Sequence, residues 1–247
     1  MTLLPERGII RRIVRGALRL DEENERLRTA MGEIVSKLRP HVFLDVGCGN
    51  GDWTVSVANR MGIVPENIQG IEINPRQASE AERKLRLFRV DLEAERWPFP
   101  EQSVSLITAN QVLEHLKNAH FCLAECDRVL QVGGYLAIGI PNLAGLVNRL
   151  LLLFGSQPLC IHFPGPHVRS FTHRAFLSLL RLNPAFELVE TRGSSLYPLP
   201  WPWLEVAAVK FPGLSAYTFY LLRKIEHRIP SAWTEMLPGG GATTYVT

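Results

Sequence analysis

The chain has 247 residues, of which 46% are hydrophobic, and its formal net charge is +3. These values describe a globular protein with a sizeable core and exclude a disordered chain. The net charge is too small to indicate a nucleic acid as partner. The longest apolar run, from Leu150 to Phe154, is far shorter than the roughly 20 residues that a membrane-spanning helix needs.

The N-terminal region combines a basic face with an apolar one. Its first nineteen residues contain five arginines and one acid, Glu6, and their apolar residues recur at helical spacing. Such a helix can lie on an anionic membrane surface, although we favour a solvated helix that covers a binding pocket. Because arginines interrupt the apolar positions, no signal peptide is expected. The arginines are Arg7, Arg11, Arg12, Arg15 and Arg19.

A second helix is predicted over 22–38, and a buried strand over 42–46 then runs into Gly47, Gly49 and Gly51. Glycines allow φ values that are closed to other residues, and they let a ligand lie directly against the backbone. The backbone N–H groups at the start of the next helix would face such a ligand. The G-x-G-x-G spacing differs from the G-x-G-x-x-G of dinucleotide-binding proteins, so it disfavours a nicotinamide cofactor. The alternative is a tight turn that binds nothing.

Strands and helices alternate further along the chain. We expect strands at 68–73, 88–91, 104–109 and 135–140, and helices at 52–61, 75–84 and 119–130. This alternation indicates a parallel sheet with helices on both faces. Glu72 ends the second strand, 21 residues after Gly51, where a carboxylate can accept hydrogen bonds from both hydroxyls of a ribose.

The cysteines include no C-x-x-C pair. We therefore expect reduced thiols in a cytoplasmic protein rather than disulfides or a zinc site. The four are Cys48, Cys122, Cys126 and Cys160.

The segment from Phe43 to Asn142 resembles the class I S-adenosylmethionine (SAM)-dependent methyltransferases, and looks closest to the ubiquinone-biosynthesis-type subgroup, which methylates small molecules. Five motifs follow one another in the family's order and spacing. They are Glu72 ending strand two, Asp91 ending strand three, Pro98-Phe99-Pro100, Leu113-Glu114-His115, and Arg128-Val129-Leu130 before Gly133-Gly134. One departure is Ser105, where the family usually has an aspartate inside strand four, and it bears on local packing.

The resemblance implies an α/β fold. The sheet would be Rossmann-like and doubly wound, with seven strands in the order 3-2-1-4-5-7-6, strand 7 antiparallel, and helical lid insertions over the carboxyl ends of the strands. Residues 1–247 would form one domain. Within it, 1–38 would be an N-terminal helical cover, 39–140 the SAM-binding core, 141–170 and 195–240 the lid insertions, and 242–247 the final strand.

The chain beyond strand five is similar to bacterial methyltransferases encoded with glycan genes and to methionine-biosynthesis W-type proteins. The residues that carry this similarity are Asn142, Arg149, Gly155, Pro158, His167, Arg169, Phe171 and Thr172. Periodicity predicts an apolar helical stripe over 143–154, helices over 171–182 and 216–228, and a strand over 186–190.

The resemblance also implies roles for residues that bind SAM. Glu72, followed by Ile73, would hold the ribose hydroxyls, Asp91 the adenine amino group, and Leu92 would lie beside the ring. Asp45 would favour the ammonium group electrostatically. The methionine portion would lie against the turn of Gly47, Cys48, Gly49 and Gly51, with Asn110. The alternatives are structural: Asp45 could orient the glycine turn, and Glu72 or Asp91 could cap the following element.

Methyl transfer from a sulfonium is an in-line displacement that needs alignment, exclusion of water and, for some acceptors, a base. His115 is the candidate base, since imidazole titrates near neutrality. His167, Arg169 and Trp201 are candidate acceptor residues, with loop anchoring and buried packing as the alternatives, and buried packing is favoured for Trp203 too. No metal site is expected, because the spacings of Cys160, His162, His167 and His173 match no zinc pattern.

We therefore predict a SAM-dependent methyltransferase that acts on a small-molecule, glycan or lipid-linked acceptor. We place it in the cytoplasm, with peripheral contact to the inner membrane surface through the N-terminal basic helix as an open alternative. The alternative function is a SAM-binding regulatory partner of the W type with little turnover of its own.

Overall fold

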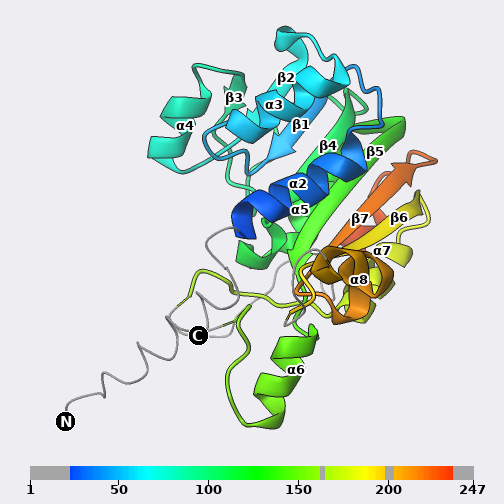
Figure 1. The fold of residues 1–247 in the computed structure, drawn as a ribbon. Coiled ribbons are helices and arrows are strands. Elements are labelled where there is room, and N and C mark those ends of the chain that lie inside the picture. Colours follow the sequence, from blue (N-terminus) through cyan, green and yellow to red (C-terminus); the bar gives the residue numbers. More distant parts are fainter. Residues whose placement is uncertain (1–22, 162–164, 198–202, 236–247) are drawn as a thin grey trace, which may run out of the picture.

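The computed structural model describes residues 23–161, 165–197 and 203–235. At its centre is a seven-stranded sheet with the strand order β3-β2-β1-β4-β5-β7-β6 (Figure 1). β7 is antiparallel to both of its neighbours, β5 and β6, whereas β1 to β5 pair in parallel. The predicted doubly wound topology is confirmed.

The elements alternate along the first half of the chain, as a parallel sheet requires. The strands are β1 (Phe43–Val46), β2 (Ile68–Ile71), β3 (Arg86–Phe88), β4 (Val104–Asn110), β5 (Leu130–Pro141), β6 (Phe186–Ser194) and β7 (Tyr217–Lys224). The α-helices are α2 (Glu23–Val35), α3 (Asp52–Met61), α4 (Pro75–Ala81), α5 (Ala119–Val129), α6 (Leu146–Leu153), α7 (His173–Arg181), α8 (Trp203–Lys210) and α9 (Ala232–Glu235). Short 3₁₀ helices are η2 (Pro65–Asn67), η3 (Leu113–His115) and η4 (Pro212–Leu214).

Helices cover both faces of the sheet. On one face α2 and α3 pack against β1, β2 and β4 through residues such as Met31, Val57 and Phe43. On the other face α5 and α7 pack against the sheet, and Trp233 of α9 stacks on Phe186 with ring centroids 4.9 Å apart. These two apolar layers fix the sheet, and with it the edge at which its strands end.

The carboxyl ends of the parallel strands meet at one edge. Val46 lies opposite Ile71 on one side and Ala109 on the other. At the far side of the sheet, Pro141 at the end of β5 lies opposite Tyr217. Ligands of open α/β sheets bind outside this edge, so the loops that leave it are where a site is sought.

One prediction for the C-terminal part is wrong. Residues 217–224 form strand β7 and not the predicted helix. This strand is buried on both faces, and a continuous apolar run cannot be assigned to helix or strand by periodicity alone. The seventh strand of the sheet therefore comes from here, whereas residues 242–247, for which we predicted it, lie outside the described residues.

Other boundaries shift less. β3 ends at Phe88, so Asp91 lies in the loop beyond it and does not end the strand. The helix predicted over 22–38 is α2, which begins at Glu23 and ends at Val35. The basic helix predicted within the first nineteen residues lies outside the described residues.

Ser105, the departure from the family pattern, joins β4 to the start of β1. Its Oγ accepts hydrogen bonds from the N–H groups of His41 and Val42, both at 2.8 Å, and donates to the Val42 carbonyl at 2.9 Å. A hydroxyl can both donate and accept, unlike an ionised carboxylate. The serine therefore satisfies all three backbone groups.

The four cysteines are free thiols, and Cys48, Cys122 and Cys126 are buried. In the described part of the chain, no helix combines the length and the apolar character needed to cross a bilayer.

Candidate functional site

The glycine turn after β1 opens its backbone toward the carboxyl edge of the sheet. Gly47 has φ +72°, and a Cβ there would lie 2.7 Å from Cγ2 of Val112. Both the backbone conformation and the lack of space therefore exclude a larger residue. Gly49 has φ +59°, and a Cβ there would have no neighbour closer than Oε1 of Gln77 at 3.9 Å. The backbone at Gly49 is thus open on one side, as a turn that receives a ligand would be.

Glu72 follows β2 and reaches over this turn. Its Oε2 accepts a hydrogen bond from the N–H of Gly49 at 3.0 Å, and its Oε1 accepts one from the N–H of Asn74 at 2.8 Å. The two bonds fix the carboxylate beside the open backbone. Each oxygen keeps further acceptor capacity, because an ionised carboxylate offers about four lone-pair sites.

The loop after β3 lies at the same edge. The N–H of Glu72 donates to the carbonyl of Phe88 at 3.2 Å, which ties the end of β2 to the end of β3. Asp91 accepts from the N–H of Glu93 at 2.9 Å, so it caps its own turn. Leu92 packs against the core, and Ile73 is largely exposed.

The end of β4 presents two buried polar atoms that have no hydrogen-bond partner among the described residues. Oδ1 of Asn110 and Nε2 of Gln111 are buried and make no hydrogen bond within the structure. Gln111 has φ +58°, which is strained for a residue with a side chain. Unpaired buried polar groups are costly, and such costs persist at ligand sites more often than elsewhere.

Asp45 is buried behind the glycine turn. Its carboxylate accepts hydrogen bonds from the hydroxyls of Thr54 and of Thr108, the latter at 2.6 Å. Burial raises the pKa of Asp45 to about 6. The side chain thereby joins the start of α3 to β1 and β4, which is the structural role we had set beside the electrostatic one.

A second cluster, formed by Glu114, His115 and His167, lies just beyond β4. One ligating atom from each of the three lies within 4.8 Å of the others, and the two imidazole rings meet edge to face with centroids 4.7 Å apart. The segment 165–172 is held here because the N–H groups of Val168 and Arg169 donate to the carbonyl of Glu114 at 2.9 and 3.0 Å. The fold thus brings His115 next to Pro166, although the two residues are 51 positions apart in the chain.

Both histidines of this cluster can accept a proton. Nδ1 of His115 lies 3.2 Å from the carbonyl of Pro166, and Nδ1 of His167 lies 2.6 Å from the carbonyl of Cys160. A carbonyl only accepts hydrogen bonds, so each Nδ1 carries the proton and each Nε2 keeps a lone pair. Burial lowers the pKa of His115, which favours its neutral form at neutral pH.

Glu114 is the unusual member of the cluster. The residue is 1% exposed, and neither carboxyl oxygen has a hydrogen-bond partner within the structure. Burial raises the pKa of this carboxyl to about 8. A buried carboxyl beside two imidazoles could bind a divalent cation or hydrogen-bond an acceptor molecule, and it could exchange a proton with His115.

The raised pKa of Glu114 predicts a measurable effect on stability. Below pH 4.5 the carboxyl is protonated in both the folded and the unfolded chain. Between there and about pH 8 the unfolded chain loses the proton and the folded chain keeps it, so the free energy of unfolding falls as the pH rises. Replacing Glu114 by glutamine removes this ionisation. We expect Glu114→Gln to be more stable than the native chain at pH 8 by a few kcal/mol, since one pKa unit corresponds to about 1.4 kcal/mol.

Urea unfolding at pH 5, 6.5 and 8 measures this effect, with the exposed Glu66→Gln as the matched control. The advantage of Glu114→Gln should grow from pH 5 to pH 8, whereas Glu66→Gln should follow the native chain. Parallel stability curves for all three proteins would show that Glu114 ionises normally.

The other predicted acceptor residues have different surroundings. Arg169 donates to the carbonyls of Leu116 and Lys117 at 3.1 and 2.9 Å, which is the loop-anchoring alternative. His173 lies away from the cluster and stacks on Tyr220. Trp201 lies outside the described residues. Trp203 is 67% exposed, so the buried packing that we favoured for it is wrong.

Sequence reasoning gave no role to Glu114. The residue follows the buried Leu113 and precedes the candidate base, and its neighbours along the chain show nothing of its burial. That burial depends on the distant segment 165–172, which covers it. An acid flanked by Leu113 and a histidine was the one signal that could have drawn attention to it.

Comparison with known proteins agrees with this geometry. Residues 44–138 match a family described as "Methyltransferase domain". The demethylmenaquinone methyltransferase of Bacillus licheniformis is 24% identical over 78% of this chain and 73% of its own length. The trans-aconitate 2-methyltransferase of Methylobacterium radiotolerans is 33% identical, but the match spans only 52% of this chain and 50% of that relative.

Among solved structures, the geranyl diphosphate C-methyltransferase of Streptomyces coelicolor superposes with a TM-score of 0.52 at 17% identity, covering 80% of this chain and 77% of that one. Its complex contains S-adenosyl-L-homocysteine. At this level of identity the likeness concerns the fold. The three proteins are named for acceptors as different as demethylmenaquinone, trans-aconitate and geranyl diphosphate, so similarity alone does not select an acceptor.

Proposed function

We propose that this chain, which belongs to the class I SAM-dependent methyltransferases, transfers a methyl group from SAM to a small-molecule acceptor held at Glu114, His115 and His167. The single observation that carries the acceptor site is the buried carboxyl of Glu114, unpaired and beside two imidazoles. Polar groups that converge at the edge of an apolar core are what an acceptor site needs to orient a ligand.

The residues of the glycine turn fit SAM. We infer that Glu72 binds the ribose hydroxyls, because its carboxylate is fixed beside the open backbone of Gly49. The unpaired Oδ1 of Asn110 suits the ammonium of the methionine portion, and the ionised Asp45 behind the turn adds negative charge there. Ile73 and Leu92 would border the adenine, with Asp91 at its amino group. Gly47, Cys48 and Gly51 would shape the turn.

When bound, SAM supplies a methyl group on a positively charged sulfur, which is already activated for displacement. The chain then has to align the acceptor, exclude water and take up a proton. His115 is suited to proton uptake, because its Nε2 keeps a lone pair. Glu114 can take up a proton in its ionised form, which a pKa of about 8 leaves populated near the working pH. We propose that the loop containing His167, with Arg169 as its anchor, forms one wall of the acceptor site, as part of the lid 141–170.

The test is incubation of the protein with radiolabelled SAM and with aqueous and lipid extracts. We expect one acceptor to be labelled by the native chain, and the rate to fall by roughly 10²–10⁴-fold in Glu114→Gln and His115→Gln, the range that a lost acid–base group gives. SAM affinity measured by calorimetry should stay within about twofold, because neither residue is placed at SAM.

Labelling at equal rates in all three proteins would remove the cluster from the mechanism. Binding of SAM with no labelled acceptor in any extract, together with a co-purifying enzyme, would instead support a SAM-binding partner protein.

A further inference from the structure

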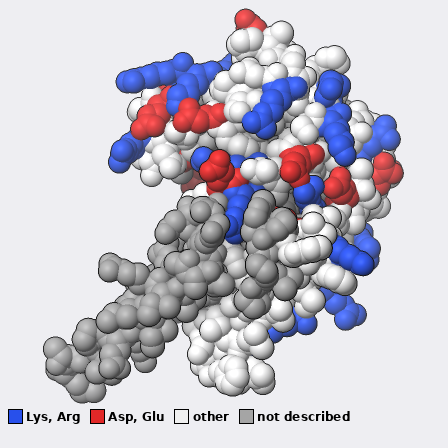
Figure 2. Space-filling model, in the orientation of Figure 1, with Lys and Arg blue, Asp and Glu red and all other residues white. Residues whose placement is uncertain are grey.

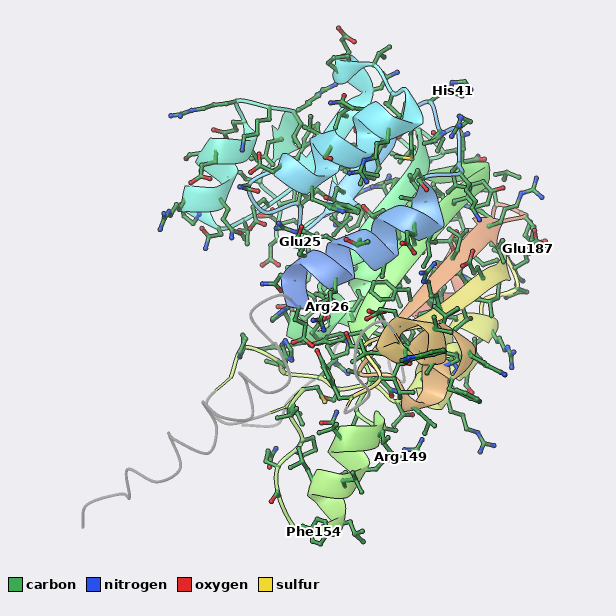
Figure 3. All side chains as sticks on the ribbon, viewed as in Figure 1. Glu25, Arg26, His41, Arg149, Phe154 and Glu187 are labelled. Carbon is green, nitrogen blue, oxygen red and sulfur yellow. The ribbon has the colours of Figure 1, made fainter. Side chains whose placement is uncertain are left out.

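Helix α6 projects from the body of the molecule, beyond the carboxyl edge of the sheet (Figure 1). Its far end carries large apolar side chains that no other part of the described chain covers. The exposed fractions are 45% for Leu150, 54% for Leu152, 76% for Leu153 and 79% for Phe154. Phe154 stands at the tip of the helix, and Arg149 lies nearer the body (Figure 3).

The segment of the chain that carries this apolar tip contains no acid. No aspartate or glutamate occurs between Asp127 and Glu187, and the arginines closest to α6 in the sequence are Arg149, Arg169 and Arg174. Figure 2 shows the same end of the molecule as a mostly uncharged surface with basic side chains at its margin and no acidic one, in contrast to the mixed charges over α3 and α4. An exposed apolar tip in an acid-free, arginine-bearing segment matches an anionic bilayer, which takes up apolar groups and attracts cations.

The base of α6 is connected to the acceptor cluster by hydrogen bonds. The side chain of Asn148 is buried, donates to the carbonyl of Asn142 at 3.0 Å and accepts from the N–H of Leu159 at 2.8 Å. Cys160 follows directly, and its carbonyl accepts from Nδ1 of His167. A bilayer that holds the tip of α6 would therefore lie on the side of the molecule on which the base of α6 meets the cluster.

We propose that α6 docks the protein on an anionic membrane by inserting Leu152, Leu153 and Phe154 among the lipid headgroups. We also infer, on the basis of the proposed function, that the acceptor is a lipid-borne molecule that reaches Glu114, His115 and His167 from that membrane. The eight residues of α6 are about 12 Å long, so the helix anchors at the interface and does not span. This surface is the far end of the apolar stripe that the sequence predicts over 143–154.

The first experiment is sedimentation of the full chain with vesicles of phosphatidylcholine, alone or mixed with phosphatidylglycerol. We expect binding to the anionic vesicles that weakens in high salt. In Leu153→Glu with Phe154→Glu it should fall at least about tenfold, because interfacial binding scales with buried apolar area and attraction to anionic lipid. The matched control is Val64→Glu with Val189→Glu, which adds the same charge at two other exposed apolar positions and should bind like the native chain.

Two results would overturn the docking surface. One is failure of the native chain to bind anionic vesicles at low salt, and the other is equal loss of binding in the tip variant and the control. A native dimer that becomes monomeric in the tip variant by light scattering, without vesicle binding, would assign the tip to a second copy of the chain and also overturn it.

The second experiment separates this inference from the proposed function. Methyl transfer is measured with lipid extract in vesicles and in detergent. We expect the tip variant to lose activity on vesicles and to keep it in detergent, with unchanged affinity for SAM. Native binding to vesicles with a labelled acceptor only in the aqueous extract would overturn the lipid-borne acceptor. Vesicle binding without methyl transfer in any extract would contradict the proposed function and leave the docking surface in place.

Discussion

Replacing Glu72 by alanine is expected to weaken the binding of SAM by at least about a hundredfold. A hydrogen bond to a charged group contributes about 1.5–3 kcal/mol, and two such bonds to the ribose hydroxyls correspond to a hundredfold or more at about 1.4 kcal/mol per tenfold. The loss has a second source, since the N–H of Gly49 would lose the carboxylate that it now bonds at 3.0 Å. The turn that receives the ligand would be less well ordered.

Calorimetric titration with SAM measures this loss. Glu72→Gln keeps one acceptor oxygen without the charge and should lie between the native chain and Glu72→Ala. Glu80→Ala removes an exposed acid from the neighbouring α4 and should bind SAM normally. A folded Glu72→Ala, checked by thermal unfolding, that binds SAM with native affinity would exclude Glu72 from the site.

The largest effect on stability is expected for the buried ion pair of Lys224 and Asp127. Their charged atoms lie 3.0 Å apart, and the two side chains are 0% and 1% exposed. Lys224 also donates to the carbonyl of Leu130 at 3.0 Å, while Asp127 accepts from Asn183 and Ser231 at 3.1 and 2.6 Å. Lys224→Met leaves the aspartate without its counter-charge. We expect it to lower the free energy of unfolding by about 3–5 kcal/mol, as when one partner of a buried pair is removed.

Urea unfolding tests this, with the exposed pair of Arg223 and Glu187 as control. Arg223 precedes Lys224 on β7 and pairs with Glu187 of β6. The charged atoms of this pair are 3.6 Å apart and both side chains are 49% exposed, so Arg223→Met should cost no more than about 1 kcal/mol. The double variant Asp127→Leu with Lys224→Met should lose less than the sum of its single changes, because no charge is then left buried alone. Equal and small losses at Lys224 and Arg223 would show that the buried pair does not contribute as proposed.

The fold could be predicted from the sequence mainly where a short stretch of sequence is enough to identify a helix, strand or turn. The glycine turn, the acid after β2 and the alternation of strands with helices are all read within short windows, and they led to the correct sheet. β7 could not be read in this way. Tyr217 to Lys224 is covered on both faces, so its apolar residues carry no period of two.

The same difference applies to the candidate site: some of its residues could be assigned from the local sequence, and others depend on segments far away in the chain. Glu72 and the glycines could be proposed as site residues from the sequence, because they lie in one turn and beside it. Glu114 was not, because its burial comes from a loop some fifty residues further along, and its raised pKa has no counterpart in its neighbours. Arg169 was assigned to an acceptor for its charge, although the structure uses its guanidinium on the carbonyls of Leu116 and Lys117.

The position of β7 between β5 and β6 also dictates an order of assembly. β6, ending at Ser194, leaves the ribosome before β7, yet β7 is the one strand among the described residues with which it pairs. Until Lys224 has emerged, Phe186 to Ser194 has no ladder to join, and the edge of β5 stays open. A nascent chain that stops short of residue 217 would expose both edges, which are sites for wrong pairing between chains. β7, the last described strand, is therefore the one that joins β6 to the rest of the sheet. Once it has been synthesised, the strand edges that favour aggregation are paired.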